Sequence, residues 1–152
     1  MSGQETTFQM LLMAALVLLS AFFSATETAF SSLNRTRLKS MADRGDRRAS
    51  RALALSERYD ELLSTILVGN NIVNIALASI GTVFFVNLIG SSGVSISTAV
   101  ITVVVLVFGE ISPKSIAKEM PERFAMLVTP AVKLLMTLLK PVNWVFAQWK
   151  SC

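Results

Sequence analysis

Apolar residues gather in two long runs that a polar, basic segment separates. One run extends from Thr6 to Asn34 and holds a single charged residue, Glu27. The other extends from Leu62 to Gly109, 48 consecutive residues without a charged side chain. Because a membrane-spanning helix needs about 20 apolar residues at a rise of about 1.5 Å each, the first run is long enough for one span and the second for two.

A glycine- and serine-rich stretch, Gly90 to Gly93, is the natural break within the longer run. We therefore predict an all-α integral membrane fold with three transmembrane helices, at about residues 8–33, 62–89 and 95–111. The alternative of a cleaved signal peptide for the first run is disfavoured, because the leading MSGQET carries no cation and the apolar core is too long.

The cations predict the orientation of these spans. Of the 14 Lys and Arg residues, 8 lie between Arg35 and Arg58 and 6 between Lys114 and Lys150. Since cytoplasmic loops are rich in Lys and Arg, we place the helical basic loop at 35–60 and the C-terminus inside, and the N-terminus outside. A basic segment beside two spans indicates an anionic cytoplasmic lipid leaflet as its partner and no nucleic acid.

The segment at about 122–150 is apolar enough to suggest a fourth span. However, Lys133 and Lys140 fall near its middle, and a lysine at a helix centre costs about 2.5–3.5 kcal/mol on insertion scales. We predict instead an amphipathic juxtamembrane helix at the cytoplasmic surface, broken at Pro130 and Pro141. The whole chain, 1–152, then forms a single transmembrane domain.

The composition excludes several chemistries. Soluble domains carry about 25% charged residues, whereas this chain has 16%. It has no histidine and a single cysteine, Cys152, so histidine-based catalysis, an internal disulfide and a thiolate metal cluster are all excluded. We expect no enzymatic activity; a membrane enzyme would have to rely on carboxylate chemistry.

Polar residues form a stripe on the first span. Ser20, Ser24, Glu27 and Ser31 are spaced 4, 3 and 4 residues apart, which places them within about 60° of one another on a helix. Serines can also hydrogen-bond their own helix carbonyls, and small polar residues can serve as helix contacts, so a structural role remains an alternative.

The other two spans also bring oxygen atoms. The second span carries Asn70, Asn71 and Asn74, and its Gly69 and Gly81 let neighbouring helices approach closely. The third span ends in a segment with Gly109, Glu110, Pro113 and Lys114; Pro113 lacks an N–H and so frees the carbonyl of Gly109. Oxygen ligands without histidine or thiolate suit a hard cation such as Mg²⁺, Ca²⁺ or Na⁺.

Three segments carry a resemblance to a known family. SAFFSATETAFSSLNRTRL at residues 20–38, VGNNIVN at 68–74 and FGEISPK at 108–114 resemble the transmembrane domain of the CorC/cyclin M (CNNM) family of magnesium transporters. The resemblance extends over about residues 10–150. Full-length relatives continue into a CBS pair that binds ATP, a region that is absent here, so we expect an excised membrane domain without nucleotide regulation of its own.

The resemblance implies a homodimer in the plasma membrane, with three spans in each subunit and Mg²⁺ as the transported ion. It places the ion in an inward-open acidic cavity. The implied metal residues are Ser20, Ser24, Asn70, Gly109 and Glu110, and the implied cavity-lining or supporting residues are Glu27, Asn71, Asn74, Pro113 and Lys114.

The expected function is Mg²⁺ export. A divalent cation that leaves against 100 mV climbs about 4.6 kcal/mol, and the sequence holds no ATP-hydrolysis motif, so Na⁺ is the expected coupling ion. The alternative is a non-transporting membrane scaffold or metal-sensing subunit, in which the same polar residues only hold helices together.

Overall fold

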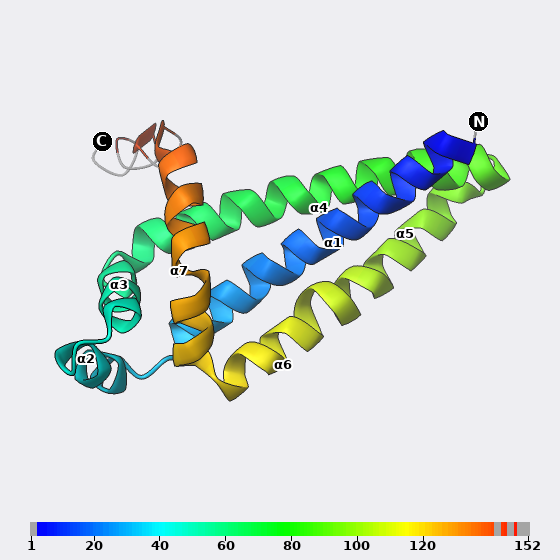
Figure 1. Ribbon diagram of the computed structural model, residues 1–152. Helices are drawn as coiled ribbons and strands as arrows, with labels where there is room; N and C mark the ends of the chain where they lie inside the picture. Colours follow the sequence, from blue (N-terminus) through cyan, green and yellow to red (C-terminus); the bar gives the residue numbers. More distant parts are fainter. Residues whose placement is uncertain (1–2, 142–143, 146–147, 149–152) are drawn as a thin grey trace. The chain divides into compact units, whose positions relative to one another are not determined.

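The computed structural model describes residues 3–141, 144–145 and 148. Within that part of the chain all regular elements are helical and none is a strand. In chain order they are α1 (Gly3–Ser32), α2 (Arg35–Asp43), α3 (Arg47–Ser56), α4 (Tyr59–Ile89), α5 (Gly93–Val104), the π-helical segment η1 (Val105–Ile111), α6 (Ser112–Glu119) and α7 (Pro121–Leu138) (Figure 1).

Three helical stretches are long and apolar enough to cross a membrane: Gly3–Ser32, Tyr59–Ile89 and Gly93–Glu119. Their outer faces carry large apolar side chains in the open, such as Leu18, Ile75 and Val103, which are 70%, 68% and 60% exposed. Apolar surface on this scale is unfavourable in water and favourable in lipid. The protein is therefore an all-helical membrane protein, as the charge pattern predicted.

The third helix differs from its prediction, because it does not end at Ile111. η1 follows α5 directly and α6 follows η1, so the helical path continues to Glu119. The backbone N–H of Ser112 donates to the carbonyl of Val107, five residues back, which is the π-helical spacing. Pro113 follows as the second residue of α6 and has no N–H to donate back into η1. The proline is accommodated by a change of helical register rather than by a break.

The chain divides into two compact units, and the division crosses three helices. The first unit consists of residues 1–25 and 69–115, and the second of residues 26–68 and 116–152. The first therefore holds most of α1, most of α4, α5 and η1. The second holds α2, α3 and α7.

In the first unit, a tight turn joins α4 to α5. Gly90 has a φ of +87°, a conformation that favours glycine. Gly93, at the start of α5, lies against the end of α4 so closely that a Cβ atom there would come 2.5 Å from the carbonyl oxygen of Phe85. The break predicted from the glycines is confirmed, and Gly93 is required by packing.

In the second unit, α3 packs against both α2 and α7. Ala49, Ala52 and Leu55 of α3 are fully or almost fully buried, at the helical spacing that forms one apolar face. Asp46 caps α3 by accepting hydrogen bonds from the N–H groups of Arg48 and Ala49, at 2.9 and 3.2 Å. The basic segment thus contains two short helices, α2 and α3.

A buried carboxylate ties α7 to the start of α2. Glu122, in the first turn of α7, is 8% exposed. It accepts a hydrogen bond from the backbone N–H of Asn34 at 3.3 Å and lies 3.8 Å from the guanidinium of Arg37. Arg35 in turn donates to the carbonyl of Ser56, at the end of α3, at 2.8 Å. These contacts hold the ends of three helices of the second unit together.

The predicted break at Pro130 is wrong, because α7 runs through this residue without interruption. A proline inside a helix removes one backbone hydrogen bond, here the one to the carbonyl of Met126, at a cost of about 3 kcal/mol. The buried face of α7 around it offsets this cost through the packing of Ala125, Val128, Val132 and Met136. α7 ends at Leu138, before Pro141. The parts of the predicted juxtamembrane helix at residues 142–143, 146–147 and 149–150 lie outside the described residues.

Candidate functional site

Ser20 lies at the centre of the polar residues of the first unit. It is fully buried, and its hydroxyl lies 3.4 Å from Oδ1 of Asn70 and 3.3 Å from Oδ1 of Asn74. Asn70 and Asn74 are four residues apart on α4, so both amides leave the same face of that helix. The hydroxyl therefore bonds across to another helix and not to a carbonyl of its own.

The third helix reaches the same place through Gly109. A Cβ atom at Gly109 would lie 3.0 Å from Oγ of Ser20 and 3.5 Å from its Cβ. Gly109 is buried and belongs to η1. The missing side chain is thus what allows the backbone of η1 to come up against Ser20, so that three helices meet at one hydroxyl group.

At the Ser20 hydroxyl, two acceptors compete for one donor. The Ser20 hydroxyl has one hydrogen, and two amide oxygens converge on it. Both O···O distances exceed the usual 2.7–2.8 Å of such a hydrogen bond by roughly 0.5 Å. A set of convergent, loosely paired oxygens is the arrangement that a hard cation or a water molecule would complete.

The π-helical turn is the feature of this site that the sequence analysis missed. Single π-helical turns inside α-helices occur frequently at functional sites. A signal was present, since Gly109 and Pro113 are four residues apart and the α-helical bond between them cannot form. This pair predicts a freed carbonyl at Gly109 but not a change of helical register, and the predicted span ends at Ile111, whereas the helix continues.

The remaining predicted metal residues lie close by along their helices. Ser24 is buried one turn after Ser20 on α1, and Glu110 is half-buried in η1 directly after Gly109. The predicted supporting residues are less uniform: Pro113 and Lys114 are half-buried, Asn71 is exposed and Glu27 is half-buried. Glu27 belongs to the second unit, and its membership of the site stays a prediction.

Gly69 sits next to Asn70 and receives the ring of Phe23. A Cβ at Gly69 would lie 2.6 Å from the ring carbon Cζ of Phe23, a residue that is 4% exposed. Gly81, further along α4, meets Ile101 and Ser97 of α5 in the same way, at 2.9 and 3.2 Å. The close approach of neighbouring helices at these two glycines is confirmed.

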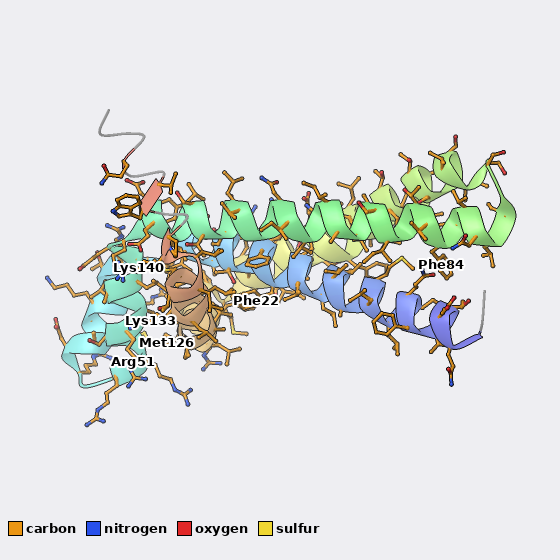
Figure 2. All side chains as sticks on the ribbon, turned by 90° about the horizontal axis from the view of Figure 1, so that it is seen from above. Phe22, Arg51, Phe84, Met126, Lys133 and Lys140 are labelled. Atoms are coloured by element: carbon orange, nitrogen blue, oxygen red, sulfur yellow. The ribbon has the colours of Figure 1, made fainter. Side chains whose placement is uncertain are left out.

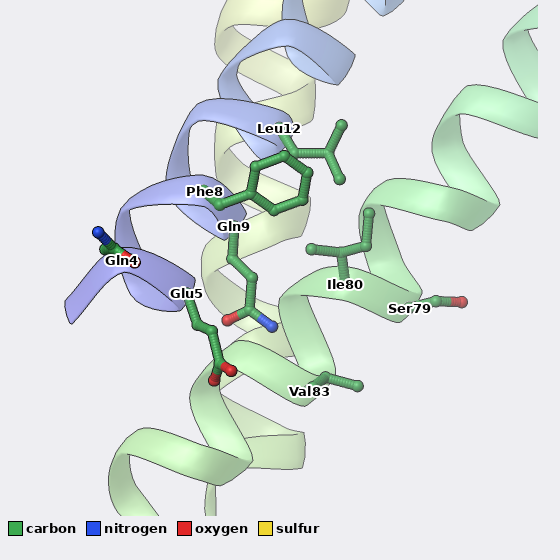
Figure 3. A pocket seen from close by; sticks show the side chains of 8 residues that line it. All are labelled: Gln4, Glu5, Phe8, Gln9, Leu12, Ser79, Ile80 and Val83. Carbon is green, nitrogen blue, oxygen red and sulfur yellow. The ribbon is translucent and has the colours of Figure 1, made fainter. Parts of the chain in front are cut away.

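A separate hollow lies between the start of α1 and the second half of α4, at a distance from Ser20 along both helices (Figure 3). Its walls include Phe8, Leu12 and Ile80, and Gln9 points into the space between the two helices. The Oε1 atom of Gln9 is buried and has no hydrogen-bond partner among the described residues. The sequence analysis did not single out this glutamine.

Among the described residues, no cluster of three or more acidic or cysteine side chains could hold a metal ion. A site built from Ser20, Asn70 and Asn74 is of a different type, with neutral oxygens from hydroxyl and amide groups. Such a site binds a cation more weakly than a carboxylate cage, because the ligands carry no full charge.

The sequence of these helices matches a known family. Residues 11–149 match the model of the cyclin M transmembrane N-terminal domain. The chain belongs to the cyclin M (CNNM) family. The match extends over nearly the whole chain and includes all three motifs that carried the resemblance.

Several curated relatives of this CNNM domain are bacterial or plant proteins. The chain is 44% identical to the UPF0053 inner membrane protein YfjD of Escherichia coli over 83% of its own length and 29% of that protein. It is 40% identical to a UPF0053 protein of Haemophilus influenzae over 91% of its length and 33% of the relative. A putative DUF21 domain-containing chloroplast protein of Arabidopsis thaliana is 35% identical over 89% of the chain and 20% of the relative. The chain thus spans a third or less of these relatives.

Proposed function

We propose that this membrane domain transports Mg²⁺, and that it exports the ion in exchange for Na⁺. The observation that carries the proposal is the meeting of Ser20, Asn70 and Asn74 beside Gly109, in which two amide oxygens converge on one buried hydroxyl. Mg²⁺ as the cargo, among the hard cations, rests on the membership of the cyclin M family.

The ligand chemistry supports a cation that passes through the site without being trapped. Hydroxyl and amide oxygens replace part of the hydration shell, and the carboxylate of Glu110, next to Gly109 in η1, offsets part of the charge. Conduction requires binding that is favourable enough to enter and weak enough to leave. One carboxylate with neutral oxygens meets both requirements better than an acidic cage does.

The spacing of the oxygens bears on selectivity. In an octahedral Mg²⁺ site with bonds of about 2.05 Å, neighbouring ligands lie about 2.9 Å apart. The O···O distances of 3.3 and 3.4 Å at Ser20 would therefore have to shorten by roughly 0.5 Å on binding. A shift of this size is within reach of side-chain rotation, and it makes Mg²⁺ binding a contraction that joins α1 to α4.

The energetics favour coupling to more than one Na⁺. Export of a divalent ion against 100 mV costs about 4.6 kcal/mol. One Na⁺ entering down the same voltage releases about 2.3 kcal/mol, and a tenfold gradient adds about 1.4 kcal/mol. The total of about 3.7 kcal/mol falls short, so we propose at least two Na⁺ for each Mg²⁺.

The rest of the proposal concerns the setting of the domain. We propose a homodimer in the plasma membrane, with the N-terminus outside and the C-terminus inside, and no enzymatic activity. The basic helices α2 and α3 support an anionic cytoplasmic leaflet, since Lys and Arg beside a span favour that side. Full-length relatives would add nucleotide regulation through their CBS pair.

Flux in liposomes tests the proposal. The chain is reconstituted, and Mg²⁺ movement is followed with an internal dye, with and without a Na⁺ gradient. We expect Na⁺-dependent Mg²⁺ flux that falls at least tenfold in Asn70→Ala and in Glu110→Ala. Thr82→Val is the matched control on α4, because the Thr82 hydroxyl bonds the carbonyl of Ala78 in its own helix.

Two results would overturn the proposal. If Asn70→Ala and Glu110→Ala carry Mg²⁺ as fast as the parent chain does, the site is wrong. If the parent chain is folded and inserted but moves no Mg²⁺ with or without the Na⁺ gradient, the polar residues act as helix contacts, as in a scaffold.

A further inference from the structure

A hollow in the second unit lies between α3 and α7 and is distinct from the site at Ser20. Its volume is about 200 Å³. Two arginines of α3, Arg48 and Arg51, form one wall, and the other is lined by Met126, Leu127, Thr129 and Pro130 of α7. Positive charge thus stands on one side of the hollow and a mostly apolar surface on the other.

The two arginines are available to a ligand. Arg48 and Arg51 are three residues apart on α3, so their side chains share a face. In the part of the chain that the structure describes, the ion pairs are Arg37–Glu122 and Arg58–Glu61, and neither involves this pair. The nearby Asp46 is engaged in capping α3 through backbone N–H groups.

A further cation continues the basic side along α7. Lys133 is exposed and lies seven residues after Met126, two turns further on the same side of the helix. Figure 2 labels Arg51 and Met126, which line the hollow, and Lys133 in the region of α3 and α7. Guanidinium groups of this kind bind phosphate through paired hydrogen bonds and charge.

An apolar stripe begins at the same hollow. Leu127, which lines it, is followed on α7 by Leu134 and Leu138, and the three are 71%, 62% and 67% exposed. The spacings of 7 and 4 residues keep them within about 40° of one another, over a length of about 16 Å. A ligand for this place therefore needs an anionic group at one end and an apolar body.

We propose that this hollow binds the phosphate of an anionic phospholipid, with the acyl chains along the leucine stripe of Leu127, Leu134 and Leu138. The volume of the hollow agrees with a phosphate headgroup inside it and acyl chains outside it. At about 30 Å³ for each water molecule, 200 Å³ holds about six or seven waters, enough for a phosphate and its glycerol but not for an acyl chain. The proposal rests on the membrane location of the domain and is independent of what the Ser20 site carries.

Thermal stabilisation in a neutral detergent tests the proposal, with short-chain phosphatidylglycerol, phosphatidylcholine of the same chain length and glycerol phosphate as probes. We expect phosphatidylglycerol to raise the melting temperature, and the other two to have no effect at the same concentration. The apparent affinity for phosphatidylglycerol should fall about tenfold or more in Arg48→Ala/Arg51→Ala, because both phosphate contacts are lost. Leu134→Gln/Leu138→Gln should also weaken it.

The matched control is Arg44→Ala/Arg47→Ala. It removes the same charge from the same basic segment, but neither residue lines the hollow. We expect this variant to bind phosphatidylglycerol as the parent does. If the Arg48→Ala/Arg51→Ala variant fails to fold, Arg48→Lys/Arg51→Lys replaces it and keeps the charge. This variant should still bind phosphatidylglycerol more weakly, because a lysine lacks the paired donors of the guanidinium.

Three outcomes would overturn the proposal. Equal weakening by the control pair would mean diffuse attraction to the whole basic segment. Equal stabilisation by glycerol phosphate would identify a soluble phosphate ligand, and no effect of phosphatidylglycerol would exclude the site. Asn70→Ala should keep the lipid effect, so failure of the transport proposal is distinguished from failure of this one.

Discussion

The contact between Gly109 and Ser20 predicts that Gly109→Ala destabilises the parent protein but stabilises the Ser20→Ala variant. In Gly109→Ala, the new methyl group would lie 3.0 Å from Oγ of Ser20, closer than an ordinary carbon–oxygen contact. Ser20 is fully buried, and its hydroxyl is also in contact with Asn70 and Asn74. It therefore has little room to retreat, and the substitution overpacks the site.

Two opposing effects determine how much Gly109→Ala changes the stability. Alanine favours a helix over glycine by about 1 kcal/mol, and overpacking costs about 1–3 kcal/mol. The net effect of Gly109→Ala in the parent is then a loss of about 0–2 kcal/mol. In Ser20→Ala, the nearest atom becomes the Cβ at 3.5 Å, an ordinary contact. Only the helix preference remains, and Gly109→Ala should stabilise that variant by about 1 kcal/mol.

The assay is a double-mutant cycle on detergent-solubilised protein, with thermal stability read from the monodisperse peak in size-exclusion chromatography. For a chain of this size, 1 kcal/mol corresponds to about 2–4 °C. We expect Gly109→Ala to lower the melting temperature of the parent by up to about 8 °C and to raise that of Ser20→Ala by about 2–4 °C. An identical shift in both backgrounds would refute the contact, and with it the meeting of three helices at Ser20.

Two further predictions concern the first unit. Gly93→Ala should lower the melting temperature by about 5 °C or more, because the new Cβ would lie 2.5 Å from the backbone carbonyl of Phe85, and a backbone group cannot rotate away as a side chain can. Gly3→Ala is the control, because nothing lies within 4 Å of a Cβ at that position. Gln9→Met should keep or raise the melting temperature, because methionine has a similar shape and lacks the buried oxygen that has no partner among the described residues. Burial of such an oxygen costs about 1–3 kcal/mol. A clear loss of stability in this variant would mean that Gln9 has a partner such as a bound water.

The close contacts explain why small residues recur at the places where helices meet. In lipid, helices gain little from the hydrophobic effect on association, so packing and polar contacts must hold them. Gly69 admits the ring of Phe23, Gly81 admits Ile101, and Gly109 admits Ser20. Of these three, Gly109 alone lies directly against a polar group of the candidate site.

The sequence by itself determined the number and approximate places of the spanning helices. Charge-free runs of the lengths found before and after the basic segment have few stable arrangements other than helices in lipid, because every backbone group must be paired internally. The glycine- and serine-rich stretch placed the turn at Gly90–Gly93. The polar residues of the three spans were also found in advance, since oxygen atoms stand out in an apolar run.

The tertiary structure alone decided how these residues meet. A helical wheel places Ser20 on a stripe but says nothing of which face of α4 lies opposite, and it was the packing that brought Asn70 and Asn74 to the Ser20 hydroxyl. The predicted third span ends at Ile111, before Pro113, and the predicted juxtamembrane helix has a break at Pro130. Local preference does favour a break, yet a π-helical register absorbs the first and a buried face of α7 outweighs the second. Sequence patterns report local free energies, whereas a site is made by contacts between helices distant in the chain, whose energies enter only when the chain is packed.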